Sequence, residues 1–540
     1  MKCRLYLINE YDTMIKFCRF LNAAVLSAAL IFVTFDNLKA QDISKDIRKL
    51  AQTMYYMNRY YLDTVNFTQI SDEAVSAMMK KLDPHSAFIS AKDVKAMNEP
   101  LEGNFDGIGI EFAIINDSLS VQNVIAGGPS EKVGLRTGDK IVSVDGEAIS
   151  ATNLDIPRVH KYLRGPKGSR VELGIFRKGV PEILDYTVVR DKIPINSIDS
   201  HYLTPDNILY IRLTRFAATS YNELIDVLRG LSRKPSGIIL DLRNNVGGYL
   251  TAALMIANEF LDKGEMILYT EGLRSPRKME YADGRGVLKD IKTAVLIDEN
   301  SASASEIVSG ALQDWDRATI IGRKSFGKGL VQQQLPLEDG SVIRLTVARY
   351  HTPSGRVIQA PYEMGDAAGY YKNFYERYKR GEYFSKDSIQ LPDSLKYQTL
   401  RLKRTVYGGG GIMPDIFIPA DTSFYTQFYG ELVRKGIITD FANDYSDKHR
   451  DELVSKYKDY NIFIEKYNVT DDLFGQFLLY AEKKGAKPKE GQLEISGNEI
   501  KRFIKSLVVR NLYGFNRFIE YLNRDDREVQ RALDVIRGKE

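Results

Sequence analysis

Apolar residues near the start of the chain recur at helical spacing. Between residues 43 and 57 they occupy one helical face, at every third or fourth position. The same spacing returns after Ser71, a residue type that caps helices, and continues to Leu82 before Pro84 ends it. The sequence therefore predicts a helical region over residues 41–100.

The pattern changes twice along the middle of the chain. Residues 103–190 consist of short β-branched runs separated by glycine, which indicates a small β domain. Residues 206–350 alternate apolar runs of strand length with helical stretches, and this order predicts an α/β core with strands buried on both faces. The predicted strands are Ile208–Leu213, Gly237–Leu242, Thr293–Asp298 and Ala318–Ile321, and the predicted helices are Ser220–Leu231, Tyr249–Leu261 and Ser303–Trp315.

The last third of the chain has few strand signals. Residues 362–405 are rich in tyrosine and charge, and the glycine run Gly408–Gly411 follows them as a flexible turn. Beyond about Asp421 the sequence is charged and helix-like. We therefore expect an insertion at 362–405 and a helical region over residues 421–540.

The composition is that of a soluble globular protein with several domains. Of the 540 residues, 44% are hydrophobic and 27% are charged, and a single core does not account for this length. The net charge of +4 is far too small to indicate a nucleic-acid partner. Both cysteines, Cys3 and Cys18, lie within residues 1–40, so removal of that segment would exclude disulfides, thiolate zinc sites and a cysteine nucleophile.

Residues 1–40 resemble a signal peptide. Lys16 and Arg19 precede the apolar run Ala23–Phe35, and the small residue Ala40 follows as a cleavage site. The run is short for a membrane span, which needs about 20 residues. The alternative is an uncleaved membrane anchor. In both cases the rest of the chain is exported, and we expect it in the periplasm or the cell envelope.

A set of glycine motifs in residues 101–190 resembles a PDZ domain. The set begins with Gly107, Ile108, Gly109 and Ile110. Its later members are Gly128-Pro129-Ser130, Gly134-Leu135, Gly138-Asp139-Lys140-Ile141 and Val144-Asp145-Gly146. The resemblance implies that the loop Gly107–Ile110 binds the C-terminal carboxylate of a peptide, which adds as a strand to a sheet edge. The alternative is that these glycines serve only as turns in a small β domain.

A serine cluster begins the predicted helix that follows Thr293–Asp298. The segment Ser301-Ala302-Ser303-Ala304-Ser305-Glu306 stands where a strand-to-helix turn presents a nucleophile and where backbone N–H groups can stabilise an oxyanion. Ser303 and Glu306 also have the spacing of a capping box, so a purely structural role is the alternative.

A lysine between two glycines is a candidate general base. Lys328 lies in Gly327-Lys328-Gly329, and Gln332 follows four residues later. The five histidines are scattered and provide no evident base; they are His85, His160, His201, His351 and His449. A buried lysine can act as a base when its pKa falls from about 10.4 towards about 7–8. The alternative is a solvated lysine in a turn.

A third segment, Asp241–Gly248, ends a predicted strand with the paired glycines Gly247 and Gly248. Glycines allow backbone N–H groups to approach a ligand closely, so this segment could supply a second oxyanion donor. The alternative is a structural loop at the start of a helix.

These three segments, in this order behind a PDZ module, resemble the carboxy-terminal processing proteases, which are exported serine peptidases with a Ser–Lys dyad. The resemblance runs from about Asp42 to Pro419, and Lys328 follows Ser303 by the family's 25 positions. Further matching motifs are Asp83-Pro84-His85-Ser86, Thr352-Pro353-Ser354-Gly355-Arg356 and Gly411-Ile412-Met413-Pro414-Asp415. One residue departs from the pattern, because many relatives have proline at the position of Val246.

The resemblance assigns roles to individual residues. Ser303 would be the nucleophile, Lys328 the general base and Gln332 its orienting amide. The oxyanion donors would be the N–H of Ala304 and that of Gly247 or Gly248. No metal or other cofactor is implied.

The resemblance also implies a fold that mixes α/β and α+β domains. Residues 191–420 would form a crotonase-like (ClpP/crotonase) ββα superhelix, with the 362–405 insertion. The PDZ domain over residues 101–190 would be inserted after the N-terminal helices. The C-terminal helical region resembles Bacteroidetes-type forms and could form a homodimer or dock an adaptor protein.

The expected function is that of an exported serine endopeptidase that binds apolar C-terminal tails and cleaves through an acyl-enzyme. Two alternatives stay open at this point. One is a catalytically inactive PDZ scaffold of the cell envelope. The other is an acyl-CoA enzyme on the crotonase-like fold.

Overall fold

The computed structural model describes residues 43–115, 118–125, 127–149 and 154–539, so the predicted signal peptide lies outside the described residues. The chain forms two units, residues 1–74 and residues 75–540. In the first unit, α2 (Ser44–Tyr60) has no buried residue. Helix α3 (Phe67–Lys80) begins in the first unit and ends in the second. Within the described ranges no helix is long and apolar enough to cross a membrane.

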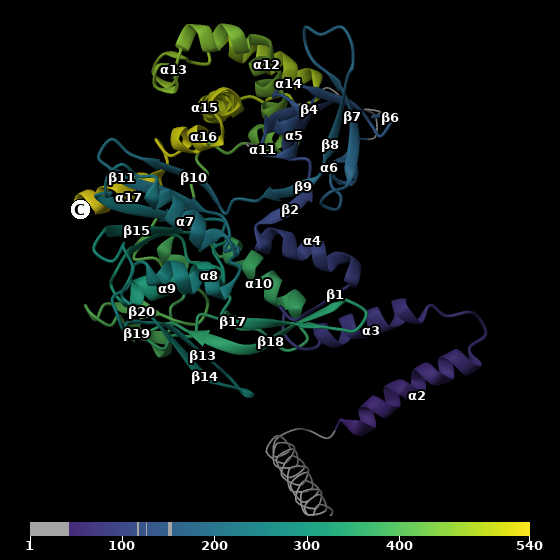
Figure 1. Ribbon diagram of the computed structural model, residues 1–540. Coiled ribbons are helices and arrows are strands. Elements are labelled where there is room, and N and C mark those ends of the chain that lie inside the picture. The colour runs from purple at the N-terminus through teal and green to yellow at the C-terminus, as the bar shows by residue number, and fades with distance from the viewer. Residues whose placement is uncertain (1–42, 116–117, 126, 150–153, 540) are drawn as a thin grey trace, which may run out of the picture. The chain divides into compact units, whose positions relative to one another are not determined.

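A six-stranded sheet forms the core of the second unit (Figure 1). Its strands are parallel except β10, which is antiparallel to β11. In spatial order they are β10 (Ile198–Leu203), β11 (Ile208–Leu213), β12 (Gly237–Asp241), β15 (Lys292–Ile297), β16 (Thr319–Gly322) and β21 (Ile416–Phe417). Strand β12 is buried along its whole length, as its continuous apolar run predicts for a strand covered on both faces.

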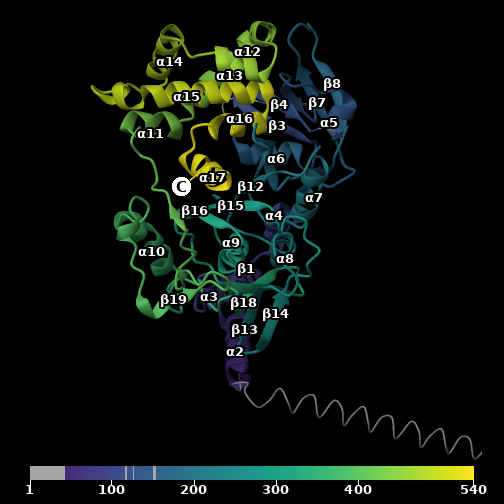
Figure 2. The same ribbon diagram turned by 90° about the vertical axis from the view of Figure 1, so that its left-hand side faces the viewer.

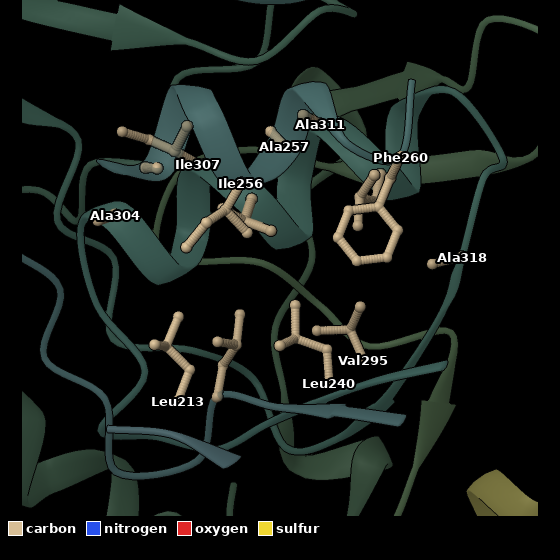
Figure 3. Close-up of a cluster of buried hydrophobic side chains, with 14 of the residues drawn as sticks. Leu213, Leu240, Ile256, Ala257, Phe260, Val295, Ala304, Ile307, Ala311 and Ala318 are labelled. Atoms are coloured by element: carbon tan, nitrogen blue, oxygen red, sulfur yellow. The ribbon is translucent and has the colours of Figure 1, made fainter. Parts of the chain in front are cut away.

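One face of this sheet is covered by helices that carry the larger apolar core. Figure 3 shows Ile256 of one helix and Phe260, just beyond the end of that helix, above Leu240 and Val295 of the strands; all four belong to the same buried cluster. The helices on this face are α7 (Ser220–Arg229), α8 (Leu250–Asn258) and α9 (Ala304–Asp314). The predicted helices are therefore present, with ends that differ by up to three residues.

The opposite face is covered by the end of the chain. Helix α16 (Phe515–Leu522) lies beside β10, and α17 (Arg527–Arg537) lies across β12, β15 and β16 (Figures 1 and 2). Ile536 of α17 packs so closely on Gly237 that a methyl group there would approach its side chain to 2.3 Å. The C-terminal helices are thus part of the core.

A second sheet lies below the first in Figure 1, and the loop that carries Lys328 leads into one of its strands. Its order is β1 (Ala87–Ile89), β18 (Val342–His351), β13 (Met266–Gly272) and β14 (Ser275–Tyr281), and β17 (Leu330–Pro336) also pairs with β18. Residues 337–341 form the turn that joins β17 and β18 as an antiparallel hairpin. Gln332 lies on β17 as a result.

Residues 104–194 contain a separate antiparallel sheet with its own apolar core. Its strands are β3 (Ile110–Ile115), β4 (Ser118–Val124), β5 (Lys140–Val144), β6 (Glu147–Ala148), β7 (Arg170–Phe176) and β8 (Leu184–Val189). Two helices, α5 (Pro129–Val133) and α6 (Ile156–Leu163), lie between strands in the sequence. A two-stranded ladder of β2 (Asn104–Gly107) and β9 (Asp191–Pro194) closes this module.

The 362–405 insertion is more ordered than its composition predicts. It contains α10 (Ala367–Lys379), two short 3-10 turns, Lys386–Ser388 and Asp393–Leu395, and the strand pair β19 (Lys396–Gln398) and β20 (Thr405–Tyr407). Sequence reasoning missed these strands because each has only three residues.

The C-terminal region is helical, as predicted. Between the insertion and α16 it consists of α11 (Gln427–Arg434), α12 (Ile437–Tyr457), α13 (Tyr460–Lys466), α14 (Asp471–Lys483) and α15 (Gln492–Tyr513). These helices share an apolar core of their own. The mixed α/β, multidomain fold expected from the sequence is therefore confirmed.

Candidate active site

Ser303 is presented by a strained turn between β15 and α9. Its φ of 55° and ψ of −111° lie outside the regions that side-chain-bearing residues normally occupy. Such strain persists only where surrounding structure imposes it, and it is common at active sites. The strand-to-helix turn predicted for a nucleophile is therefore present.

The neighbouring serines of the cluster have structural bonds. The Ser301 hydroxyl donates to the Leu242 carbonyl at 2.8 Å, and the Ser305 hydroxyl donates to the Asn245 carbonyl at 2.8 Å. Both side chains are buried. They tie the start of α9 to the Asp241–Gly248 loop, so local geometry separates Ser303 from the other two.

Glu306 connects the serine turn to the lysine loop. It forms the predicted capping-box pair with Ser303, whose N–H donates to its carboxylate at 2.8 Å. The same carboxylate accepts the N–H of Gly327 at 2.7 Å and of Lys328 at 2.8 Å, and the Ser325 hydroxyl at 2.6 Å. Complete burial raises the pKa of Glu306 to about 7, although these hydrogen bonds act in the opposite direction. The sequence indicated the cap but not this second role.

Lys328 is partly buried and only weakly basic. Burial is the main cause that lowers its pKa to about 8, and the nearby charge of Arg344 lowers it further. The Nζ atom donates to Oε1 of Gln332 at 3.2 Å. The amide nitrogen of Gln332 in turn donates to the carbonyl of His85 at 2.5 Å. Gln332 is thus fixed with its oxygen towards the lysine.

The glycines beside Lys328 are required by close packing. A methyl group on Gly329 would lie 2.8 Å from the Gln359 nitrogen, and one on Gly327 would lie 2.9 Å from the Gly410 carbonyl carbon. Arg377 of α10 holds the loop from the other side and donates to the carbonyls of Lys324 and Ser325 at 2.9 and 3.0 Å. The insertion therefore helps to position the lysine loop, a role that its composition did not reveal.

Gly247 and Gly248 lie against the serine turn but differ in their bonds. A methyl group on Gly247 would lie 2.8 Å from the Ser303 β-carbon. The Gly247 N–H donates to the side-chain oxygen of Asn245 at 2.9 Å. In the part of the chain that the structure describes, the N–H groups of Val246, Gly248 and Ala304 have no acceptor. Of the two glycines that the sequence left open, only Gly248 has an unused N–H.

An ion-pair network holds this glycine loop to the C-terminal helix. Arg243 donates to Asp241 within the loop, to Asp526 at 2.8 Å and to Glu528. Glu528 also accepts from Arg323 at 2.6 Å. These contacts join residues nearly 300 positions apart, and no local sequence pattern pointed to them.

A cleft of about 800 Å³ brings the candidate site residues together. It is lined by Ser303, Lys328, Gln332, Ala304, Gly247 and Gly248. Apolar side chains form much of its wall, among them Leu101, Ile307, Leu330 and Phe374. The arrangement can hold an apolar chain beside a hydroxyl, a weakly basic amine and free backbone N–H groups.

The predicted peptide-binding loop lies at the edge of the small β sheet. Gly107 ends β2, Gly109 has a φ of +78°, and Ile110 begins β3. Strand β3 is the edge strand of its sheet and, within the described residues, pairs only with β4. The buried Ile108 is held by its carbonyl, which accepts the Ser130 hydroxyl at 2.7 Å. The free edge of β3 suits an added peptide strand.

Among the described residues no group of three or more His, Cys, Asp or Glu side chains is arranged to hold a metal ion.

Comparisons with known proteins agree with these features. The family model for peptidase family S41 matches residues 207–364, and a PDZ domain matches residues 120–177. A family of unknown function matches residues 428–514 of the C-terminal region.

Individual relatives match a larger part of the chain. A carboxy-terminal-processing protease of Bartonella bacilliformis is 37% identical over 350 residues, which are 63% of this chain and 79% of the relative. A probable CtpA-like serine protease of Staphylococcus aureus is 33% identical over 345 residues, 63% of this chain and 68% of the relative. A solved photosystem II D1 C-terminal processing protease is 27% identical, and the match covers 71% of this chain and 89% of the relative, with a TM-score of 0.36.

These matches favour the protease over the inactive scaffold that the sequence left open. The chain belongs to peptidase family S41, among the carboxy-terminal-processing proteases, and is a serine protease with a PDZ domain.

Proposed function

We propose that the protein cleaves peptide bonds with Ser303 as nucleophile and Lys328 as general base. One observation carries this proposal: a partly buried lysine with a pKa of about 8 shares a cleft with the one serine of the cluster that does not tie α9 to the Asp241–Gly248 loop. Gln332 would orient the amine without adding charge, because its oxygen accepts from Nζ.

The proposed reaction has two halves. The Ser303 oxygen attacks the substrate carbonyl while Lys328 takes the hydroxyl proton. The C–N bond then breaks, and Lys328 gives this proton to the leaving amine. Water, deprotonated by Lys328, then attacks the acyl-enzyme. The ester bond breaks, Lys328 returns the proton to the Ser303 oxygen, and the new carboxyl terminus is released. The N–H groups of Ala304 and Gly248 would stabilise both oxyanions.

Gly247 would have a different role from Gly248 in this mechanism. Its N–H is already bound to Asn245, and its missing side chain allows the loop to touch the Ser303 β-carbon. We therefore assign the second N–H that binds the oxyanion to Gly248. Gly247 is needed because it has no side chain, which lets the loop lie against Ser303.

Substrate capture would begin at the PDZ domain. Backbone N–H groups of Gly107–Ile110 would bind the free carboxylate of an apolar C-terminal tail, and the tail would pair with the free edge of β3. A peptide with a free, apolar C-terminus should then be cut faster than the same peptide with an amidated C-terminus. Equal rates would contradict tail recognition.

The setting of this activity is also a proposal. The basic residues and apolar run of residues 1–40 support export to the periplasm or cell envelope. Exposed apolar side chains such as Val433, Val454 and Leu479 on the C-terminal helices would suit a second copy of the chain or an adaptor protein.

The nucleophile is tested by substituting the three serines one at a time. Ser303→Ala should abolish peptide cleavage and labelling by a fluorophosphonate probe, while loss of the helix cap costs only about 0.5–2 kcal/mol of stability. Ser301→Ala and Ser305→Ala are matched controls in the same turn and should retain much more activity. Cleavage by Ser303→Ala, or equal loss in all three variants, would refute the assignment.

A further inference from the structure

Arg344 is an unpaired cation in the catalytic cleft. It lies on β18 beside Gln334 of β17 and Ala87 of β1, and its side chain lines the cleft with Lys328. Within the described residues its guanidinium makes no hydrogen bond or ion pair, and its Nε atom is buried without an acceptor. Arg344 is half-buried, and a buried donor without an acceptor costs free energy.

Other arginines with little exposure in this protein are hydrogen-bonded, either to a carboxylate or, as for Arg190, to three backbone carbonyls and the Ser169 hydroxyl. Arg356 pairs with Asp314, Arg377 with Glu382, and Arg243 and Arg323 share Glu528. The contrast shows that a guanidinium without a hydrogen-bond acceptor is exceptional in this fold.

No protein carboxylate is available to Arg344. The cleft is lined by no Asp or Glu among the described residues. Asp83 already accepts from Thr346, Ser86 and the N–H of His85. Glu306 is occupied by the two loops that it joins.

A second unpaired group lies in the same cleft. The Nε2 atom of His85 is buried and has no hydrogen-bond partner in the described part of the chain. Burial and, next, the charge of Lys328 lower the pKa of His85 to about 4, so the ring is neutral and can donate or accept one hydrogen bond. Two unpaired side-chain nitrogens in one cleft, one from β18 and one from the turn before β1, indicate a polar ligand.

We propose that Arg344 binds a carboxylate of the substrate inside the catalytic cleft. This inference rests on the proposed function, because it takes the cleft as the place where the peptide is cut. A guanidinium suits the role because its planar fork binds a carboxylate through two parallel hydrogen bonds.

The position of Arg344 limits which carboxylate it can reach. Gln334, its neighbour across the ladder, lies two residues beyond Gln332 and hence about 7 Å further along β17. The carboxylate would therefore lie within about three residues of the scissile bond, since each extended residue spans about 3.3 Å. An acidic side chain and the C-terminal carboxylate of a short tail both meet this condition.

The experiment uses the full-length protein and two sets of peptides. In the first set the C-terminus is amidated, and Glu is exchanged for Gln at each of three positions on either side of the cleavage site. In the second set a tail of three residues after the cleavage site ends in a free acid or an amide. Wild-type kcat/KM should favour the carboxylate in one set by about tenfold or more, as expected for a charge-assisted hydrogen bond.

Arg344→Gln should remove this preference. Arg349→Gln is the matched control, because Arg349 is an exposed residue of the same strand that does not line the cleft. Binding of the same peptides to Ser303→Ala, with and without Arg344→Gln, measures the preference without turnover. Cleavage by Ser303→Ala would refute the proposed nucleophile. The ratio of the affinities for the carboxylate peptide and its neutral partner would still show whether Arg344 binds the carboxylate.

Two results would overturn the inference. Wild-type protein could show no preference in either peptide set, which requires no variant to fold. Alternatively, the preference could persist in Arg344→Gln.

Discussion

The two loops that flank Ser303 are held in different ways. The lysine loop, residues 324–329, is fixed by hydrogen bonds from its backbone to the buried carboxylate of Glu306 and by Arg377 from the insertion. The glycine loop, residues 241–248, is fixed by ion pairs that run from Arg243 to α17. The lysine loop is thus held by a buried acid and the insertion, whereas the glycine loop is held by the serines at the start of α9 and, in addition, by the far end of the chain.

This difference separates two kinds of precision. A general base needs its pKa set as well as its position, and partial burial and the charge of Arg344 lower the pKa of Lys328. An oxyanion donor needs position only, because a backbone N–H does not titrate. Changes on the lysine side should therefore alter the pH dependence of cleavage, and changes on the glycine side should alter the rate at every pH.

The largest expected effect comes from the base itself. Lys328→Arg keeps the positive charge but cannot release a proton at accessible pH, so kcat should fall by about 10²–10⁴-fold, the range of general-base contributions. Peptide cleavage under saturating substrate measures the change. Lys324→Arg is the control, because burial also lowers the pKa of Lys324 to about 8, but this lysine of the same loop does not line the cleft. Substantial activity in Lys328→Arg would rule out a lysine base.

The pH dependence of the wild type should follow the same lysine. With a pKa of about 8, Lys328 is neutral in about 1% of molecules at pH 6, so kcat there should be about 100-fold below its plateau above pH 9. Arg344→Gln removes the repelling charge and should move the rise to higher pH, whereas Glu306 and Asp83 act in the opposite direction.

The pH dependence of the free energy of unfolding is an independent measurement of the lowered pKa of Lys328. Between about pH 8 and 10.5 the unfolded chain holds a proton on Lys328 that the folded chain has released. The free energy of unfolding contributed by this group therefore rises with pH across that window. A cleavage profile that is flat from pH 6 to 9 would contradict the lowered pKa of Lys328.

The sequence predicted the candidate catalytic residues better than it predicted the residues that hold them in place. Ser303 and Lys328 lie in short motifs at a defined spacing, so a resemblance could select them. Glu306 was visible as a helix cap, but its bonds to Gly327 and Lys328 depend on how two distant loops pack. Such contacts leave no periodic or local signal.

Single residues on strands and helices were harder still to predict. Arg344 of β18 belongs to no sequence motif, and its lack of a hydrogen-bond partner becomes visible only in the folded cleft. Glu528 reaches Arg243 across 285 positions, in a region whose sequence indicated only charged helices. The fold class followed from strand and helix order, whereas the coupling between loops and helices required the tertiary structure.

A smaller effect should follow when the support of the glycine loop is weakened. Glu528→Gln removes the charge shared by Arg243 and Arg323, so the oxyanion donor should lose part of its alignment and kcat should fall by about tenfold, less than the 10²–10³-fold cost of losing a donor outright. KM and the pH of half-maximal rate should not change.

The matched control breaks another ion pair of the same helix. Asp206 pairs with Arg537 of α17 at 2.5 Å, in a more exposed setting, so Asp206→Asn should leave kcat unchanged. An equal loss in both variants would mean that α17 contributes general stability and has no specific role at the glycine loop.

The smallest expected effect distinguishes the candidate N–H groups of the glycine loop. Val246 is 69% exposed, and its N–H has no acceptor in the described residues, so both it and Gly248 could serve as the oxyanion donor. Val246→Pro deletes this N–H, because proline has no backbone donor. If Gly248 is the donor, kcat should stay within about threefold of wild type, and the restricted φ should add about 0.4–1 kcal/mol to the free energy of unfolding. Val246→Ala keeps the N–H and controls for loss of the side chain. A fall of about 10²–10³-fold in Val246→Pro alone would identify Val246 as the donor in place of Gly248, because that is the cost of removing one oxyanion hydrogen bond.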